Sequence, residues 1–227
     1  TKLMEPFITT AFKGLQHDDI RAVQRHYGDR YELIGADNDL SDRATNLGTP
    51  AYLTPVTLSG ISIDDNDDID WFSISTTSPT IIDITVTPAG NSYQDWDQNM
   101  FTGACATSGP TVNSQAIHNL SIDIIDADGS TVLATANTNP AGSAEILTDV
   151  SLGAAGTKYI RVRGDSTDYI QLYDLQFTLE AVGHDLTNET QPFPVAASAS
   201  TITYTIRIEN NSPINTTGVS IPSTVPA

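Results

Sequence analysis

Cysteine is nearly absent from this chain of 227 residues: Cys105 stands alone, so no disulfide bond can form within one copy. Two interpretations of this thiol stay open, a small loop or core residue and a cross-link to another chain. Basic residues are also scarce, since ten Lys and Arg face 28 Asp and Glu, giving a formal net charge of -18. Nucleic acids and anionic membranes bind basic surfaces, so this composition excludes both as partners.

Long apolar runs are missing as well. No stretch approaches the roughly 20 consecutive apolar residues of a transmembrane helix, so the sequence predicts no membrane span. Thr, Ser, Asn, Asp and Gly are abundant instead, as in many extracellular β-proteins. The strong negative charge fits a protein that is kept soluble in salt or that binds divalent cations. We therefore expect an extracellular or cell-surface protein.

The densest acidic stretch is SGISIDDNDDIDWFSI, residues 59–74. Its carboxylates repel one another unless a cation or water separates them. Calcium takes about six to eight oxygen ligands from such side chains and from nearby carbonyls. A calcium site and a merely solvated acidic turn both stay open from this stretch alone. The oxygen-bearing side chains of the turn are Asp64, Asp65, Asn66, Asp67, Asp68 and Asp70.

Short alternating segments separated by turn residues make up most of the chain after this point. Ile82, Ile84 and Val86, for example, share one face of such a segment. The tetrapeptide DADG at 126–129 predicts a tight turn between two strands. This spacing predicts a mainly β fold with an antiparallel β-sandwich. The expected strands are residues 69–75, 80–88, 120–125, 131–135, 144–152, 158–163 and 170–180.

One α-helix is expected near the beginning of the chain, over residues 15–27. Ile20, Val23 and Tyr27 recur there at helical spacing, and Gly28 suits the position after the last helical residue. A helix of this length is marginal alone, so we expect it to dock on another part of the protein.

The stretch LQHDDIRAVQRHYG, residues 15–28, resembles the closing helix of matrixin-type zinc metallopeptidases. LMEP at residues 3–6 resembles the segment around the Met-turn of that family, with Met4 as the candidate methionine. The family binds zinc through HExxHxxGxxH, which lies upstream of the Met-turn and does not occur in this chain. We therefore expect no bound zinc and no catalytic residue here, although a protease domain upstream fits the resemblance. No two histidines stand at i, i+4 spacing among His17, His26, His118 and His184.

The middle of the chain resembles the pre-peptidase C-terminal (PPC) domain found at the ends of secreted bacterial proteases. That resemblance implies a β-sandwich of the jelly-roll type, with calcium near the linker and the first strand. By position, the implied calcium ligands are Asp37, Asp39, Asp68 and Asp70. Residues 89–115, with Trp96 and Cys105, exceed the pattern and are expected to form a surface insertion. The matching segments are DND (37–39), ATNLG (44–48), DIDWFSI (68–74), LSIDIIDADG (120–129), LATAN (133–137) and GTKYIRV (156–162).

The last part of the chain has a clear strand pattern, TITYTIRIE, at residues 201–209. Together with NNSP (210–213) and GVSI (218–221), it resembles the first half of the immunoglobulin-like repeats of bacterial surface proteins. Half a sandwich leaves a bare strand edge. We therefore expect self-association through this partial domain, with a neighbouring subunit completing it by strand addition, which builds a filament when the contact does not close.

Four segments follow from these patterns: a matrixin-like remnant (1–30), an acidic linker with the first strand region (31–58), a PPC-like sandwich (59–182) and a partial Ig-like domain (183–227). Two functions fit them. The first is a non-catalytic, calcium-stabilised extracellular module in assembly, adhesion or surface structure. The second is the C-terminal accessory region of a secreted matrixin-like zinc metallopeptidase, acting in secretion, stability or substrate binding.

Overall fold

The computed structural model describes residues 15, 17–32, 37–95, 99, 101–102, 104 and 109–182. The Met-turn segment, Trp96, Cys105 and the Ig-like half at 183–227 lie outside this part of the chain, and the expectations about them stay predictions. The chain divides into two compact units, Thr1–Glu180 and Ala181–Ala227. The fold below is that of the first unit.

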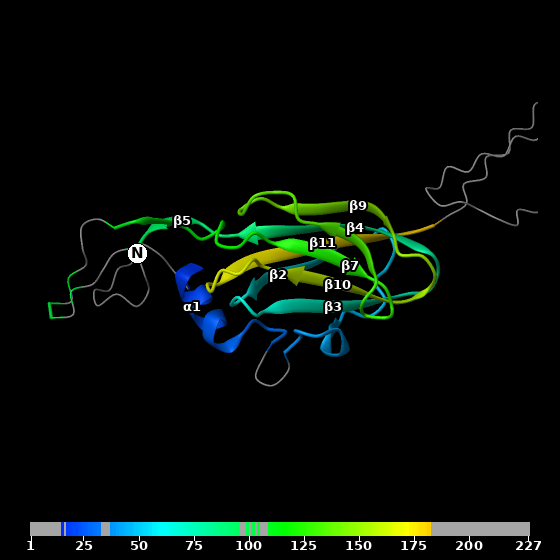
Figure 1. Cartoon of the computed structure of the whole chain (residues 1–227), viewed down its shortest axis with the longest axis horizontal. Helices are drawn as coiled ribbons and strands as arrows, with labels where there is room; N and C mark the ends of the chain where they lie inside the picture. The colour runs from blue at the N-terminus through cyan, green and yellow to red at the C-terminus, as the bar shows by residue number, and fades with distance from the viewer. Residues whose placement is uncertain are drawn as a thin grey trace, which may run out of the picture. The chain divides into compact units, whose positions relative to one another are not determined.

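Two sheets form a β-sandwich (Figure 1). Strand β1 pairs with β3 in parallel, whereas β3–β10, β10–β7, β7–β8, β2–β11 and β4–β9 are antiparallel pairs. The predicted antiparallel β-sandwich is therefore confirmed. One sheet has the order β1 (Thr45–Asn46), β3 (Ile69–Thr76), β10 (Gly156–Arg163), β7 (Ser121–Ile125) and β8 (Val132–Ala136). The other has the order β2 (Val56–Ile63), β11 (Gln171–Ala181), β4 (Thr80–Ala89) and β9 (Glu145–Ser151).

The core lies between the two sheets and consists of the alternate residues that each strand turns inward. Phe72 and Ile74 of β3 are at most 1% exposed, and Tyr173 and Phe177 of β11 face them from the other sheet. Tyr31, which follows the helix, packs edge-on against Phe72 with ring centroids 5.8 Å apart. Apolar burial of this kind, about 25 cal/mol per Å², is what holds the two sheets together.

All seven expected strands form, as β3, β4 and β7 to β11. Among the longer strands, the pattern did not show β2, in which Ser59 and Gly60 interrupt the alternation. Its register against β11 shifts between the pairs Tyr173–Ile61 and Leu175–Leu58, so β2 carries an extra residue there. Gly60 has a φ of +67°, a backbone conformation that glycine adopts without strain.

The expected turn at 126–129 is confirmed between β7 and β8. The Asp126 N–H donates to the Thr131 carbonyl at 2.8 Å, and the Gly129 N–H donates to the Asp126 carbonyl at 3.0 Å. The insertion at 89–115 holds a two-stranded sheet, β5 (Ser92–Gln94) with β6 (Thr111–Asn113). A single 3-10 turn, η1 (Ser41–Arg43), precedes β1. Within the described ranges, no helix has the length and apolar character needed to cross a membrane.

Helix α1 (His17–Tyr27) is confirmed, and Gly28 ends it with a φ of +68° and a bond from its N–H to the Gln24 carbonyl. The helix does dock on the sandwich, but through polar side chains. Gln24 Nε2 donates to the Gly60 carbonyl at 2.8 Å, and Arg21, only 8% exposed, donates to the Ile170 carbonyl at 3.1 Å. Val23 and Tyr27 are 55% and 64% exposed, so much of the apolar stripe faces away from the sheets.

This docking also covers a strand edge. Beside the Gln24 contact, the carboxylate of Asp29 accepts a hydrogen bond from the Ser62 N–H of β2 at 3.1 Å. Strand β2 is the outer strand of its sheet, and unpaired edges are sites of unwanted strand pairing. Helix α1 and the turn after it therefore protect β2 and come to lie beside the acidic turn between β2 and β3 (Figure 1).

Candidate metal centre

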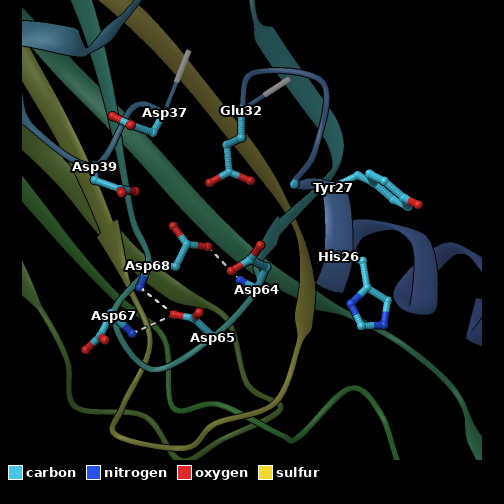
Figure 2. Close-up of a pocket in the computed structure, with 10 residues that line it drawn as sticks. His26, Tyr27, Glu32, Asp37, Asp39, Asp64, Asp65, Asp67 and Asp68 are labelled. Atoms are coloured by element: carbon cyan, nitrogen blue, oxygen red, sulfur yellow. Dashed lines mark hydrogen bonds between the residues drawn. The ribbon is translucent and has the colours of Figure 1, made fainter. Parts of the chain in front are cut away.

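An acidic pocket of ≈ 340 Å³ lies where the end of α1, residues 37–39 and the β2–β3 turn meet. Figure 2 shows carboxylates from these three segments turned toward one space. The segments are brought together by the fold, since Glu32 and Asp68 stand far apart in the sequence. The lining residues are His26, Tyr27, Gly28, Glu32, Asp37, Asp39, Asp64, Asp65, Asp67 and Asp68.

Three of these carboxylates are placed to share one ligand. Glu32, Asp39 and Asp68 each offer an oxygen, and the three oxygens lie within 4.8 Å of one another. Carboxylate oxygens are the donors that hard divalent cations prefer. An ion among them would join the chain after α1, the linker and the β2–β3 turn at a single point.

Asp68 is held in position by the turn from which it projects. Its Oδ2 accepts a hydrogen bond from the Asp64 N–H at 2.6 Å. Asp65 Oδ1 in turn accepts from the N–H groups of Asp67 and Asp68 at 2.8 and 3.1 Å, which closes the turn. These local bonds explain why the DDNDD sequence folds into a tight loop with one carboxylate pointing inward.

The other oxygen of Asp68 is the most informative atom of the pocket. Asp68 is only 8% exposed, and its Oδ1 is buried without a hydrogen-bond partner among the described atoms. Ionised Glu32 and Asp39 offer only acceptors, so they cannot donate to it. Buried polar atoms are rarely left without a partner. A shared proton, a bound water or a bound cation can bridge these oxygens.

Glu32 is positioned by a turn that follows α1. Its Oε2 accepts from the Asp29 N–H at 2.9 Å. Asp29 is 1% exposed, and its Oδ1 accepts from the Tyr31 N–H at 2.6 Å. Because Oδ2 of Asp29 bonds to β2 through Ser62, the turn and Glu32 are fixed to the sandwich.

The electrostatics of the pocket follow from crowding acidic groups where water is partly excluded. Burial, with the nearby Asp70 and Glu32, raises the pKa of Asp68 to about 11. Burial and the neighbouring Asp29 and Asp64 raise the pKa of Glu32 to about 7. Burial and Asp37 also raise the pKa of Asp39. Without a cation the pocket therefore retains protons at neutral pH, and a divalent ion would replace them.

The four expected ligands fall in different places. Asp39 and Asp68 belong to the three-carboxylate group, while Asp37 lies on the pocket lining in an ion pair with Arg43 at 2.5 Å. Asp70 is absent from the lining. It is 0% exposed and lies in the core, where it accepts from Tyr173 Oη at 2.5 Å and from Asn38 Nδ2 at 2.9 Å.

Glu32 is the residue of this group that the sequence did not reveal. It stands alone after the helix, without an acidic cluster or a motif around it. Its role depends on the docking of α1 beside β2, which no local pattern encodes. The acidic run 64–68 was visible in the sequence, but which of its side chains points inward was not.

Comparisons with known proteins add little to this geometry. No protein-family model matches the chain, and no curated protein matches it. The pre-peptidase C-terminal domain of a collagenase from Bacillus anthracis is similar in structure, with 16% identity over 60% of this chain and 94% of that chain and a TM-score of 0.33. PliG of Aeromonas hydrophila, a periplasmic inhibitor of g-type lysozyme, has 11% identity, coverage of 60% and 99%, and a TM-score of 0.33. Likeness at this level assigns neither a family nor a function to the chain.

Proposed function

We propose that this chain is a non-catalytic, calcium-stabilised β-sandwich module that works outside the cell, in assembly, adhesion or surface structure. The observation that carries the calcium part is the buried, unpartnered Oδ1 of Asp68 facing Glu32 and Asp39. The net charge of -18 supports a setting rich in divalent cations.

Calcium is the cation that this pocket fits best. Zinc favours nitrogen and sulfur ligands in tetrahedral sites, whereas the three grouped donors are carboxylates. Magnesium demands near-ideal octahedral geometry at about 2.0–2.1 Å, while calcium accepts irregular sets of about six to eight oxygens at about 2.3–2.6 Å. Glu32 and Asp39 are partly exposed, so water can complete the coordination. Calcium would act structurally here, by neutralising the cluster and joining three chain segments.

Thermal unfolding of the full chain tests this proposal. A ligand that binds only the folded state raises its stability, by about 2.7 kcal/mol when the calcium concentration is about 100 times Kd. For a domain of this size, that gain raises Tm by about 5–10 °C. We expect this rise in millimolar calcium relative to chelator, and a smaller one in equal magnesium. An unchanged Tm would contradict the calcium proposal.

Assembly is proposed to proceed by strand addition through the partial β domain at 183–227, which lies outside the residues described above. Its support is the alternating strand pattern at 201–209, because an extended segment can add a strand to the sheet edge of a neighbouring copy. Electron microscopy and intact mass on one native sample test it. Filaments built from one repeating species are the expected result. Separate monomers would contradict assembly.

A second candidate is the accessory region of a secreted matrixin-like zinc metallopeptidase. The exposed Val23 and Tyr27 favour it, because an apolar stripe on α1 that the sandwich leaves open offers a packing surface to an upstream domain. In the same sample, a much larger species whose sequence carries HExxH upstream of α1 would support this candidate over the first.

A further inference from the structure

One residue of α1 reaches the turn that carries Asp68. Arg25 Nη1 donates to the Asp64 carbonyl, and the same nitrogen lies 3.8 Å from Asp65 Oδ2. Asp65 is the residue whose Oδ1 holds the N–H groups of Asp67 and Asp68. Arg25 therefore braces the turn from outside the pocket. It contacts the Asp64 carbonyl and the Asp65 carboxylate that closes the turn.

Helix α1 is also connected to the pocket through Glu32, which follows it in the chain. Gly28 ends α1, and the Asp29 turn places Glu32 in the pocket five residues after the last helical residue. The Asp29–Ser62 bond also holds this turn to β2, so a displacement of α1 removes the Arg25 brace and moves Glu32 if the turn leaves β2 with the helix. Two of the three grouped carboxylates depend on where the helix lies.

The docking of α1 is itself modest. Arg21, Gln24 and Arg25 join the helix to the rest of the unit by polar hydrogen bonds, while Val23 and Tyr27 stay exposed. An isolated helix of 11 residues is marginally stable. Elements with few buried apolar contacts open at lower free energy than the core of a fold. Docking of α1 is thus an equilibrium that a ligand can shift.

We propose that α1 docking and cation binding at Glu32, Asp39 and Asp68 are coupled, with Arg25 as a positioning residue for the ligand turn. This inference rests on the proposed calcium site and adds its regulation. Coupling between two events is reciprocal: bound calcium favours the docked helix, and the docked helix strengthens calcium binding by the same factor.

Electrostatic repulsion alone predicts that Arg25 weakens calcium binding, whereas the coupling predicts that Arg25 strengthens it. A guanidinium near a cation site repels the cation, so its removal by itself should tighten binding. The coupling account predicts weaker binding, because the brace on the turn and part of the helix docking are lost. The sign of the change therefore distinguishes a positioning role from a mere charge effect.

Calcium titration of the full chain by calorimetry, with matched arginine variants, measures this sign. Arg25→Gln is expected to weaken calcium binding on the order of tenfold, within the usual range of coupling between sites. Arg43→Gln is the control: Arg43 also pairs with a carboxylate of the lining, Asp37, but within the described residues no hydrogen bond or ion pair joins it to α1 or to the 64–68 turn. It is expected to bind calcium as tightly as the wild type or more tightly.

Hydrogen exchange on the wild-type chain provides a second readout that needs no variant. Amides of residues 17–27 are expected to exchange on the order of tenfold faster in chelator than in calcium, and those of β7 and β10 to change less. If the wild type binds no calcium, the proposed function fails. If it binds calcium, but Arg25→Gln binds equally or more tightly and α1 exchange does not respond, the coupling is refuted and the site stands.

Discussion

The Asp68→Asn variant is expected to unfold at the same temperature in millimolar calcium as in chelator. In the metal-free protein, burial and the neighbouring Asp70 and Glu32 keep the Asp68 carboxyl protonated at neutral pH, because they raise its pKa to about 11. An asparagine has the shape of that neutral acid, and its amide can donate where the proton did. Stability in chelator should therefore change by less than about 1 kcal/mol, while the calcium response is lost because a charged ligand is missing.

Asp42→Asn is the matched control for this experiment. Asp42 lies in η1, close in sequence to Asp39, and is absent from the pocket lining. Its variant should keep the full calcium-dependent rise in Tm, measured by circular dichroism on both proteins. A normal calcium response of Asp68→Asn would place the stabilising ion elsewhere and contradict the assignment of Asp68.

Replacing Asp70 by alanine is expected to destabilise the protein by about 3–5 kcal/mol in calcium and in chelator alike. The buried hydroxyl of Tyr173 would lose its acceptor, and the buried amide of Asn38, which also donates to the Trp71 carbonyl at 3.3 Å, would lose one of two, at about 1–3 kcal/mol for a group left unsatisfied. The missing carboxyl would also leave a cavity between well-packed residues. Urea unfolding at pH 7 measures this loss, and Asp42→Ala, an exposed substitution, should stay within about 0.5 kcal/mol.

A substitution at Asp70 also tests which carboxylates bind calcium. The resemblance to the PPC domain implies Asp70 as a ligand, whereas its carboxylate lies in the core and outside the pocket lining. Asp70→Asn keeps the volume and one acceptor oxygen. We therefore expect it to retain the calcium response that Asp68→Asn loses. Loss of that response in folded Asp70→Asn would favour Asp70 as a ligand.

The strands were predictable because burial on one face imposes a period of two on the sequence. That period marks β4 through Ile82, Ile84 and Val86, each at most 1% exposed. Strand β2 was not predicted, because the bulge at Ser59 and Gly60 shifts its inward-facing positions by one residue. Regular alternation is thus readable from sequence, whereas its interruption in β2 hid that strand.

The candidate site was only half predictable, for two physical reasons. Asp70 has the same parity as Phe72 and Ile74, so the strand period that identified β3 also turns Asp70 inward, away from the acidic turn. Glu32 joins the pocket through tertiary contacts of α1 and Asp29, which leave no local pattern. The helix is similar: its existence follows from spacing, but its docking through Arg21, Gln24 and Arg25 depends on acceptors that β2 and neighbouring loops supply.

A crystal structure of the full chain grown in calcium, with anomalous data collected on the ion, tests the central claim most directly. The account predicts one anomalous peak among Glu32, Asp39 and Asp68, with oxygens of all three at about 2.3–2.6 Å from it. Density without such a peak at millimolar calcium, or a peak coordinated by other residues, would contradict the account.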